Sequence, residues 1–467
     1  MGEHGGIYET SKFNINMRKF LFIFCSIILF SSCIKKNEKE YLTKKEILED
    51  CKILENYLKT SYILYAENLK INPELINLKD DIVNSVFTQN KKEITIEDFQ
   101  KAITAELVKK ITIPDSHLTV FSSNKINQIF SSKKLYYSDI LFIEKNGKYY
   151  VYDSSDDNIR IGDEFTGNVD NLFMTIKNDI CCYQYGVMSN KMIKSCLISV
   201  NGNSYQIRVY NTKNNNEQNN YDEKKSVIIP NIDFAINNNE AAKAFNIPSD
   251  MSNYNLIIDL RNNNGGIIDN CIIYLNELLF NGNELEKLNL LNKIQTQTQK
   301  TLLSGNVLQA NYKLAKERHV SKAILFRIKI SEIFFKLFNI KNISDETKNT
   351  VNNDIKLDYS NFPKKIIVLI NNQTSSAAEL FLADLYTIGK ERVVTIGENT
   401  AGCISLIGNY KYILKNSKIG ICLSNIDERS ISQLQNPKFK GELKGFFPDY
   451  WTINGDISDY IKFVFKE

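Results

Sequence analysis

Two segments in the C-terminal half of the chain share one pattern of apolar and polar residues. Residues 254–260 and 366–370 are rich in Ile and Leu, which is typical of strands buried on both faces. Each segment ends in an Asn-rich turn, and apolar residues at helical spacing follow, up to residue 280 and residue 388 respectively. Because strands that alternate with helices form parallel sheets, the pattern predicts an α/β core over residues 223–467.

The N-terminal half follows two other patterns. From residue 37 to about residue 113, apolar residues recur every three or four positions, which predicts helices with a break near Pro73. Residues 135–210 favour strands, with a hairpin signal at Asn146-Gly147. The size of this region and the stretch at 159–164 resemble a PDZ-like module, and a generic small β domain stays open as the alternative.

Polar and helical stretches separate these units. Residues 211–225 are polar and of low complexity, which indicates a linker. Residues 283–363 are mostly helical in pattern and too long for a simple crossover, so an inserted subdomain is predicted there. The predicted division is therefore 34–125 for the helical segment, 126–222 for the β domain with its linker, and 223–467 for the core.

The N-terminus has the features of an export signal. Arg18 and Lys19 precede an apolar run at 20–30, which is too short to span a bilayer, and Ser31-Ser32-Cys33 follows. A cysteine after two small residues resembles a bacterial lipobox, which makes residues 1–33 a signal peptide with Met17 as its start and Cys33 lipidated. We therefore expect a lipid-anchored protein of the cell envelope, on the periplasmic side or the cell surface. An ordinary cleaved signal or an anchor segment is the alternative.

The composition excludes several classes of protein. A hydrophobic content of 43% and an aromatic content of 11% are globular values. The net charge of +4 comes without a basic stripe, so no nucleic-acid partner is expected. The nine cysteines show no zinc-ligand spacing and the chain has three histidines, so neither a metal nor a cofactor is expected.

The turn after residue 370 carries a candidate nucleophile. Ser375 and Ser376 lie where the turn becomes the helix. A hydroxyl there is close to unpaired backbone N–H groups and to the positive end of the helix dipole, which stabilise a developing negative charge. This is the layout of a nucleophile elbow, although the turn is not the G-x-S-x-G version. The alternative is that one serine only caps the helix.

Four motifs occur in the order found in a known family. They are DLRNNNGG (259–266), NNQTSSAAE (371–379), IGENTAG (396–402) and GELKGFFPD (441–449). In this order they resemble the C-terminal processing, or tail-specific, serine peptidases, of which the tricorn core protease is a relative. The resemblance covers residues 40–467 and is strongest over 225–467. It implies a crotonase/ClpP-like α/β peptidase core.

The resemblance assigns the nucleophile and removes one candidate base. The nucleophile of the family lies three residues before a Glu, which selects Ser376 here and leaves Glu379 to shape the start of the helix. In one branch of the family a Lys base follows the Gly of the T-x-G segment. In this chain Cys403 follows Gly402, so the base must come from elsewhere.

The tricorn-like branch of the family uses a histidine as base. The Ser116-His117 pair matches that branch, although a lone histidine is often only structural. A histidine base works best beside a carboxylate, and the E-x-x-G-x-x-P-D pattern places Glu442 in that role. Ser116 is expected to assist on the Glu442 side. Three other carboxylates compete with Glu442, namely Asp115, Asp427 and Asp449.

The family also implies an oxyanion hole made of backbone N–H groups. One donor comes from the N-N-x-G-G turn, which gives Gly265 with Gly266 as the adjacent candidate. The other comes from the residue after the nucleophile, Ala377. Without the other motifs, the two glycines would equally fit a plain strand-to-helix turn.

These features together predict an exported serine endopeptidase with a Ser-His-Glu mechanism. Its partners would be polypeptides, bound by the PDZ-like domain as an extended strand or by their C-terminus. Two alternatives stay open: a non-catalytic relative that binds peptide or ligand on the same fold, and an esterase-type hydrolase.

Overall fold

The structure is a computed structural model, and it describes residues 40–87, 93–123, 125–211, 226–229, 232, 234, 248, 250–280, 298–317, 320–347, 360, 362–408, 410–429, 436–453 and 456–466. The predicted leader at 1–33 with Cys33, the linker at 212–225, and residues 283–297 and 348–359 of the predicted insertion lie outside the described residues. In the part of the chain that is described, no helix has the length and apolar content required to span a membrane.

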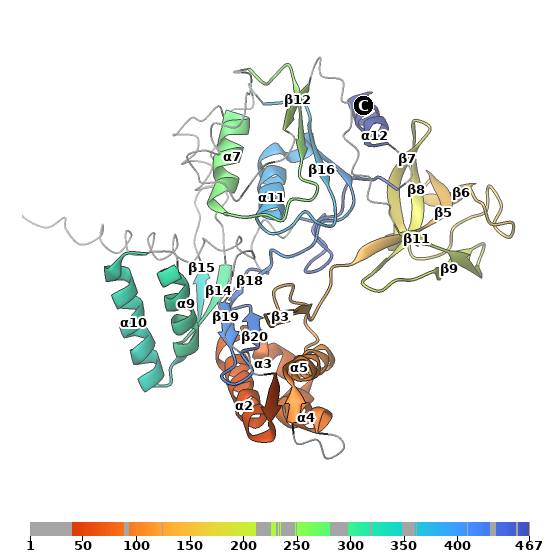
Figure 1. Cartoon of the computed structure of the whole chain (residues 1–467). Coiled ribbons are helices and arrows are strands. Elements are labelled where there is room, and N and C mark those ends of the chain that lie inside the picture. Colours follow the sequence, from red (N-terminus) through yellow and green to blue (C-terminus); the bar gives the residue numbers. More distant parts are fainter. Residues whose placement is uncertain are drawn as a thin grey trace, which may run out of the picture.

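The centre of the molecule is a parallel five-stranded sheet (Figure 1). Its strands, in spatial order, are β12 (Ser226–Ile229), β13 (Asn255–Asp259), β16 (Ile366–Ile370), β17 (Val393–Gly397) and β22 (Tyr450–Trp451). All four pairings between neighbours are parallel. Strand β16 is buried at every position, as its continuous apolar run predicts. The predicted α/β core is confirmed.

Helices cover both faces of this sheet. Helices α7 (Asp269–Phe280) and α11 (Ala377–Gly389) pack on the face that carries Ile258 and Val368. Helix α12 (Ile457–Lys466) packs on the opposite face, against Ile257 and Ile367. Successive residues of a strand point to opposite faces, so a strand between two helical layers requires apolar residues at every position.

The N-terminal segment is helical, as the spacing of its apolar residues predicts. Its elements are α2 (Lys44–Ser61), α3 (Tyr65–Ile71), η1 (Pro73–Asn77), α4 (Leu78–Val86) and α5 (Ile96–Lys110), and a two-stranded sheet joins β1 (Tyr41–Thr43) to β2 (Glu93–Thr95). Pro73 begins η1, where its missing N–H removes no helical hydrogen bond. The predicted break near Pro73 is therefore present.

Two antiparallel sheets join segments that are distant in sequence. The first contains, in order, β19 (Tyr410–Ile413), β20 (Gly420–Leu423), β3 (Thr119–Phe121) and β4 (Ile126–Gln128). The second contains β15 (Lys341–Thr347), β14 (Thr298–Ser304), β21 (Ile426–Asp427) and β18 (Leu406–Ile407). Since β3 begins two residues after His117 and pairs with β20, the first sheet ties the Ser-His motif to the C-terminal part of the chain.

A separate β domain occupies residues 134–211. Its strands are β5 (Lys134–Lys145), β6 (Lys148–Asp153), β7 (Leu172–Lys177), β8 (Ile180–Ser189), β9 (Ser195–Val200), β10 (Asn203–Arg208) and β11 (Tyr210–Asn211). The predicted hairpin at Asn146-Gly147 joins β5 to β6, with positive φ at both turn residues. Residues 125–211 contain one helical turn, η2 (Val169–Asn171), and no α-helix. The PDZ-like character of this domain stays a prediction.

The described part of the predicted insertion is a helical hairpin. Helices α9 (Gly305–Glu317) and α10 (Lys322–Leu337) lie between β14 and β15, which pair with each other. The helices agree with the sequence pattern, whereas the strand pair is not predicted by it. Strand β15, KNISDET, is mostly polar and carries no apolar alternation that would indicate a strand.

Candidate active site

The turn that precedes α11 is a strained nucleophile elbow. Ser376, the residue before the helix, has φ 56° and ψ −122°, a conformation that a non-glycine residue adopts only when its surroundings hold it there. The hydroxyl of Thr374 donates to the carbonyl of Leu260 at 2.7 Å, and the N–H of Ser375 donates to the carbonyl of Asn263 at 2.9 Å. The end of β13 therefore holds the elbow in place.

The glycine turn after β13 packs directly against this elbow. Gly265 has φ +80°, and a Cβ atom there would lie 2.6 Å from the nitrogen of Ala377 and 2.9 Å from Cβ of Ser376. No side chain fits at such distances, so the position requires glycine for both its conformation and its surroundings. The structure thus brings together the glycine motif and the nucleophile motif, as the oxyanion-hole prediction requires.

The N–H groups at this point are not equally available to a substrate. The N–H of Gly265, the first candidate for an oxyanion donor, already donates to Oδ1 of Asn263 at 2.9 Å. Within the described residues, the N–H groups of Gly266 and Ala377 have no hydrogen-bond partner. In this conformation Gly266 and Ala377 are therefore the two donors that remain for an oxyanion.

Glu379 is a structural residue of the site. Its carboxylate is fully buried and accepts from the N–H groups of Ser376, Gly402 and Cys403 at 3.2, 2.8 and 2.9 Å. It also accepts from the hydroxyl of Thr400. Burial raises its pKa, and the bonds from Cys403, Thr400 and Gly402 oppose that rise. Glu379 thus joins the elbow to the segment 400–403, in agreement with the expectation that it shapes the start of the helix.

Cys403 lies at the elbow, where a lysine base would otherwise be expected. Its thiol is 3.5 Å from Oε2 of Glu379 and interacts with the backbone of Ser376. Burial, followed by the charges of Glu379 and Glu442, raises the pKa of the thiol well above its ordinary value. A thiol that stays protonated cannot remove a proton from Ser376. Cys403 is therefore excluded as the base.

A chain of three side chains runs from a carboxylate to the predicted base. Oε1 of Glu442 accepts from the N–H of Ser116 at 3.0 Å and from its hydroxyl at 2.5 Å. Oγ of Ser116 lies 3.2 Å from Nδ1 of His117. Ser116 therefore stands between Glu442 and His117, the role that the tricorn-like pattern implies for it.

When Glu442 is ionised, these contacts determine which ring nitrogen of His117 carries the proton. A hydroxyl has one proton, and Ser116 donates it to Glu442 when that carboxylate is ionised. Oγ of Ser116 can then only accept from Nδ1–H of His117. This tautomer leaves the lone pair on Nε2, the nitrogen that can take a proton from a nucleophile.

Burial controls the charges of both residues. It raises the pKa of Glu442 to about 8, although Ser116 and Ser405 act in the opposite direction through their hydrogen bonds. It lowers the pKa of His117, and the charge of Asp115 opposes this. His117 is therefore neutral at pH 7, as a general base must be.

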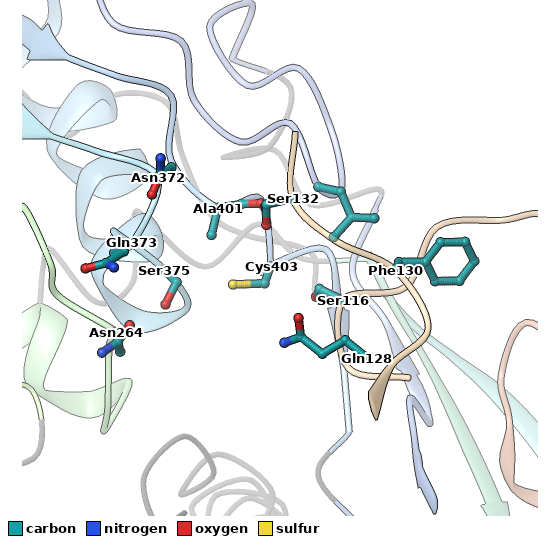
Figure 2. Close-up of a pocket in the computed structure, with 11 residues that line it drawn as sticks. Ser116, Gln128, Phe130, Ser132, Asn264, Asn372, Gln373, Ser375, Ala401 and Cys403 are labelled. Carbon is teal, nitrogen blue, oxygen red and sulfur yellow. Dashed lines mark hydrogen bonds between the residues drawn. The ribbon is translucent and has the colours of Figure 1, made fainter. Parts of the chain in front are cut away.

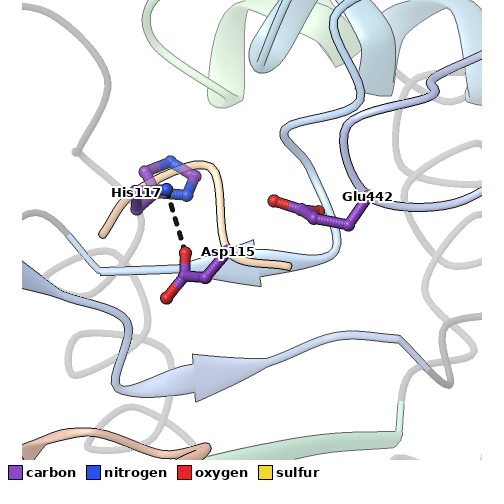
Figure 3. Close-up of side chains that lie close together, drawn as sticks. All are labelled: Asp115, His117 and Glu442. Atoms are coloured by element: carbon purple, nitrogen blue, oxygen red, sulfur yellow. Dashed lines mark hydrogen bonds between the residues drawn. The ribbon is translucent and has the colours of Figure 1, made fainter. Parts of the chain in front are cut away.

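Of the competing carboxylates, only Asp115 lies near His117. Its Oδ1 accepts from the backbone N–H of His117 at 2.9 Å and from the hydroxyl of Ser424 at 2.9 Å (Figure 3). Asp115 therefore supports the backbone of the Ser-His motif and does not bond to the ring. Asp427 pairs with Arg429, and Asp449 pairs with Lys438.

Asp115, His117 and Glu442 also form the one group of potential metal ligands found among the described residues. Their donor atoms lie within 4.8 Å of one another, and Figure 3 shows the carboxylate of Glu442 pointing toward the imidazole. Both oxygens of Glu442 already accept hydrogen bonds from serines, and Oδ1 of Asp115 accepts two. The hydrogen bonds account for the cluster, so we do not assign a metal to it.

A small cavity separates the elbow from the Ser-His motif. It measures about 220 Å³ and is lined by residues of both sides, including Ser375, Asn264, Ser116 and Gln128. Cys403 lies between Ser375 and Ser116 in Figure 2. The ring of His117 bonds to Ser116, and within the described part of the chain it makes no direct hydrogen bond to Ser376. The cavity is therefore lined by Ser375 and Ser116, the neighbours of the predicted nucleophile and base, and not by Ser376 or His117 themselves.

Two supporting contacts are not predicted from the sequence. The hydroxyl of Ser405 donates to Oε2 of Glu442, so the carboxylate has a serine on each oxygen. Ser424, at the end of β20, holds Asp115. Neither serine lies in a recognisable motif, and only the pairing of β20 with β3 brings Ser424 to the site.

A serine held at positive φ at the start of a helix is how serine hydrolases expose their nucleophile. The sequence then narrows the class, because residues 227–424 match the family model of peptidase family S41. This match supports the prediction, drawn from the four motifs, that the chain is a serine-type peptidase. The matched range includes Gly265, Ser376 and Cys403 but neither His117 nor Glu442, so the roles of those two residues rest on the geometry above.

Several solved structures resemble the chain at low sequence identity. Mature CPAF complexed with lactacystin is 14% identical, with 87% of this chain and 93% of that chain covered and a TM-score of 0.40. The photosystem II D1 C-terminal processing protease is 12% identical, with 87% and 92% covered and a TM-score of 0.33. The tricorn protease is 13% identical, with 90% and 35% covered and a TM-score of 0.32. None of the curated proteins matches the chain.

Proposed function

We propose that the chain is an exported serine endopeptidase in which Ser376 is the nucleophile and His117 the general base. The observation that carries the proposal is the hydrogen-bonded chain from Glu442 through Ser116 to Nδ1 of His117. A histidine oriented in this way presents Nε2 as a base, and the elbow places the Ser376 hydroxyl at the N-terminus of α11.

The proposed reaction begins when the substrate carbonyl is bound beside the elbow. Nε2 of His117 takes the proton of the Ser376 hydroxyl while Oγ attacks the carbonyl carbon. The negative charge that develops on the carbonyl oxygen is stabilised by the N–H groups of Gly266 and Ala377. The imidazolium returns its proton to the leaving amine, and water then hydrolyses the acyl-enzyme by the same steps.

Glu442 stabilises the imidazolium of His117 through the hydroxyl of Ser116, which lies between the two side chains. Its negative charge reaches His117 through Ser116, which donates to the carboxylate and accepts from Nδ1–H. Closing the site would bring Nε2 to Ser376, since catalytic hydrogen bonds are often long before substrate binds. We therefore regard the cavity of about 220 Å³ as the space that substrate fills between the elbow and the Ser-His motif.

The proposed substrates are polypeptides that enter in an extended conformation. The support is the match of residues 227–424 to the family model of peptidase family S41, together with a β domain that has an exposed short strand, β11, at the edge of its sheet. An extended peptide can add to such an edge through backbone hydrogen bonds.

Cleavage of an unfolded polypeptide tests the proposal. The wild-type chain should degrade it, Ser376→Ala should abolish cleavage, and Ser375→Ala should retain it, since Ser375 is the matched hydroxyl next door. Hydrolysis of a small ester without any peptide cleavage would instead indicate an esterase. Full peptide cleavage by a correctly folded Ser376→Ala variant would overturn the assignment of the nucleophile.

We further propose that the mature protein is anchored in the cell envelope through Cys33. The support is the sequence alone: a basic pair, an apolar run and two small residues before the cysteine. Metabolic labelling with a radioactive fatty acid should label the wild-type chain and not the Cys33→Ser variant. Equal labelling of both would rule out this anchor.

A further inference from the structure

Helix α10 packs against the rest of the protein with its polar side. Glu332 is its one buried residue among those described, with a relative exposure of 2%. Its carboxylate accepts from Lys329 and Lys336, at 2.9 Å each. On α9, Gln309 accepts from Lys336, and the ring of Tyr312 lies under the ammonium of Lys329. The contact between the two helices is thus largely polar.

The apolar side chains of α10 point into solvent. Phe326, Ile330, Phe334 and Leu337 recur every three or four residues, so they share one face of the helix. Each is at least half exposed, from 50% for Phe334 to 75% for Leu337. Figure 1 shows α10 at the outer edge of the molecule, with α9 between it and the other elements. Four large apolar side chains exposed on one helix face mark a site of interaction.

Basic residues border this face. With 3.6 residues per turn, Lys322 and Lys329 lie along one side of it and Arg327 lies along the other. Residues 305–341 contain eight Lys or Arg against two Glu, a net charge of +6, whereas the whole chain carries +4. The rest of the chain is therefore slightly negative, and the basic charge is concentrated on the hairpin.

We propose that α10 is an interfacial helix that lies in the surface of an anionic lipid bilayer. Phenylalanine, isoleucine and leucine side chains would enter the acyl boundary, while lysine and arginine along the borders would meet the anionic headgroups. A second copy of the chain fits the face less well, because pairing two such faces would bring two strongly basic hairpins together. This inference does not depend on the peptidase assignment.

A tryptophan placed on the face tests the proposal in the full chain. Phe326→Trp puts the probe on the apolar face, and Met192→Trp puts a matched probe at an exposed site of the β domain, where Met192 is 81% exposed. The wild-type chain supplies the background, since its single tryptophan, Trp451, is buried. The vesicles contain phosphatidylglycerol and phosphatidylcholine with brominated acyl chains, which quench tryptophan on contact.

The proposal predicts that the probe at 326 is quenched and shifted to the blue, that the probe at 192 is not, and that high salt weakens the effect. Adding Ile330→Gln and Leu337→Gln to Phe326→Trp should reduce the quenching severalfold. Equal quenching of both probes, as tethering by the N-terminus alone would give, overturns the proposal. The absence of quenching at 326 would also overturn the proposal. A blue shift that grows with protein concentration in the absence of vesicles would indicate that a second copy of the chain covers the face, and it would overturn the proposal as well.

Discussion

The hydroxyl of Ser116 decides how His117 can act. It lies between Oε1 of Glu442 and Nδ1 of His117, and it has one proton to give. With that proton on the side of Glu442, the imidazole must carry its own proton on Nδ1. The basic nitrogen is then Nε2, and a single serine sets the tautomer of the base.

Ser116→Ala should therefore impair catalysis without unfolding the protein. We expect kcat to fall roughly tenfold to a hundredfold, since an oriented base contributes about that much or more. Ser116→Thr, which keeps the hydroxyl, is the matched control and should retain most of the activity. Peptide hydrolysis by the two variants measures the difference, and an unchanged kcat in Ser116→Ala would contradict the relay.

The pH profile should report the ionisation of Glu442. Burial raises its pKa to about 8, so the carboxylate is largely protonated below that value and cannot stabilise an imidazolium. We expect kcat/KM to rise as the pH increases through about 8. In Glu442→Gln, which cannot ionise, the rate should be low and this rise should be absent. A profile in Glu442→Gln with the same rise as wild type would assign it to another group.

At the scale of elements, two turns and one sheet build the site. The turn after β13 and the elbow after β16 meet because these strands are neighbours and their carboxyl ends lie at the same edge of the sheet. The Ser-His motif is brought there by the pairing of β3 with β20. Two of these contributions follow the carboxyl end of a strand, and the third, the Ser-His motif, lies just before the start of β3.

Gly265→Ala should disrupt this junction. A methyl group at that position would lie 2.6 Å from the nitrogen of Ala377, and φ +80° is unfavourable for alanine. We expect a loss of stability of about 1–3 kcal/mol. We also expect kcat to fall roughly a hundredfold, because the clash would displace the N–H of Ala377, one of the two proposed oxyanion donors. Denaturant unfolding and peptide hydrolysis check the two effects. Gly202→Ala, in the β domain, meets no neighbouring atom but also has positive φ, and it separates backbone strain from the clash.

Local sequence patterns predict the helices, strands and turns better than they predict the contacts between them. The apolar run at β16 and the positions of Pro73 and Asn146-Gly147 are local signals, and the structure contains the corresponding strand, break and hairpin. The contacts of Ser405 with Glu442 and of Ser424 with Asp115 come from the way distant segments pack. Neither residue belongs to a motif or a periodic pattern, so the sequence holds no signal for them.

At the scale of the whole molecule, buried carboxylates link stability to pH. Burial raises the pKa of Glu428 and that of Glu442 to about 8 each, from an ordinary value of 4.5. A raised pKa in the folded state means that stability is greatest below the unfolded pKa and falls as the pH rises through the folded pKa. Both groups therefore destabilise the fold as they ionise.

The free energy of unfolding should accordingly decrease between about pH 4.5 and pH 8, by a few kcal/mol in order of magnitude. Glu428→Gln removes one of the two groups and should flatten the decrease, while Glu144→Gln, at a surface position of β5, should not change it. Chemical denaturation at a series of pH values gives the comparison. Parallel curves for wild type and Glu428→Gln would show that Glu428 does not contribute.

The central claim is that Ser376 is a nucleophile activated by His117, and covalent labelling tests it most directly. The measurement is the rate at which a fluorophosphonate modifies the folded protein, with Ser375→Ala as the control. We predict labelling of wild type and Ser375→Ala, none of Ser376→Ala, and a rate lowered at least a hundredfold in His117→Ala. Labelling of His117→Ala at the wild-type rate, or of Ser376→Ala at all, would contradict the account.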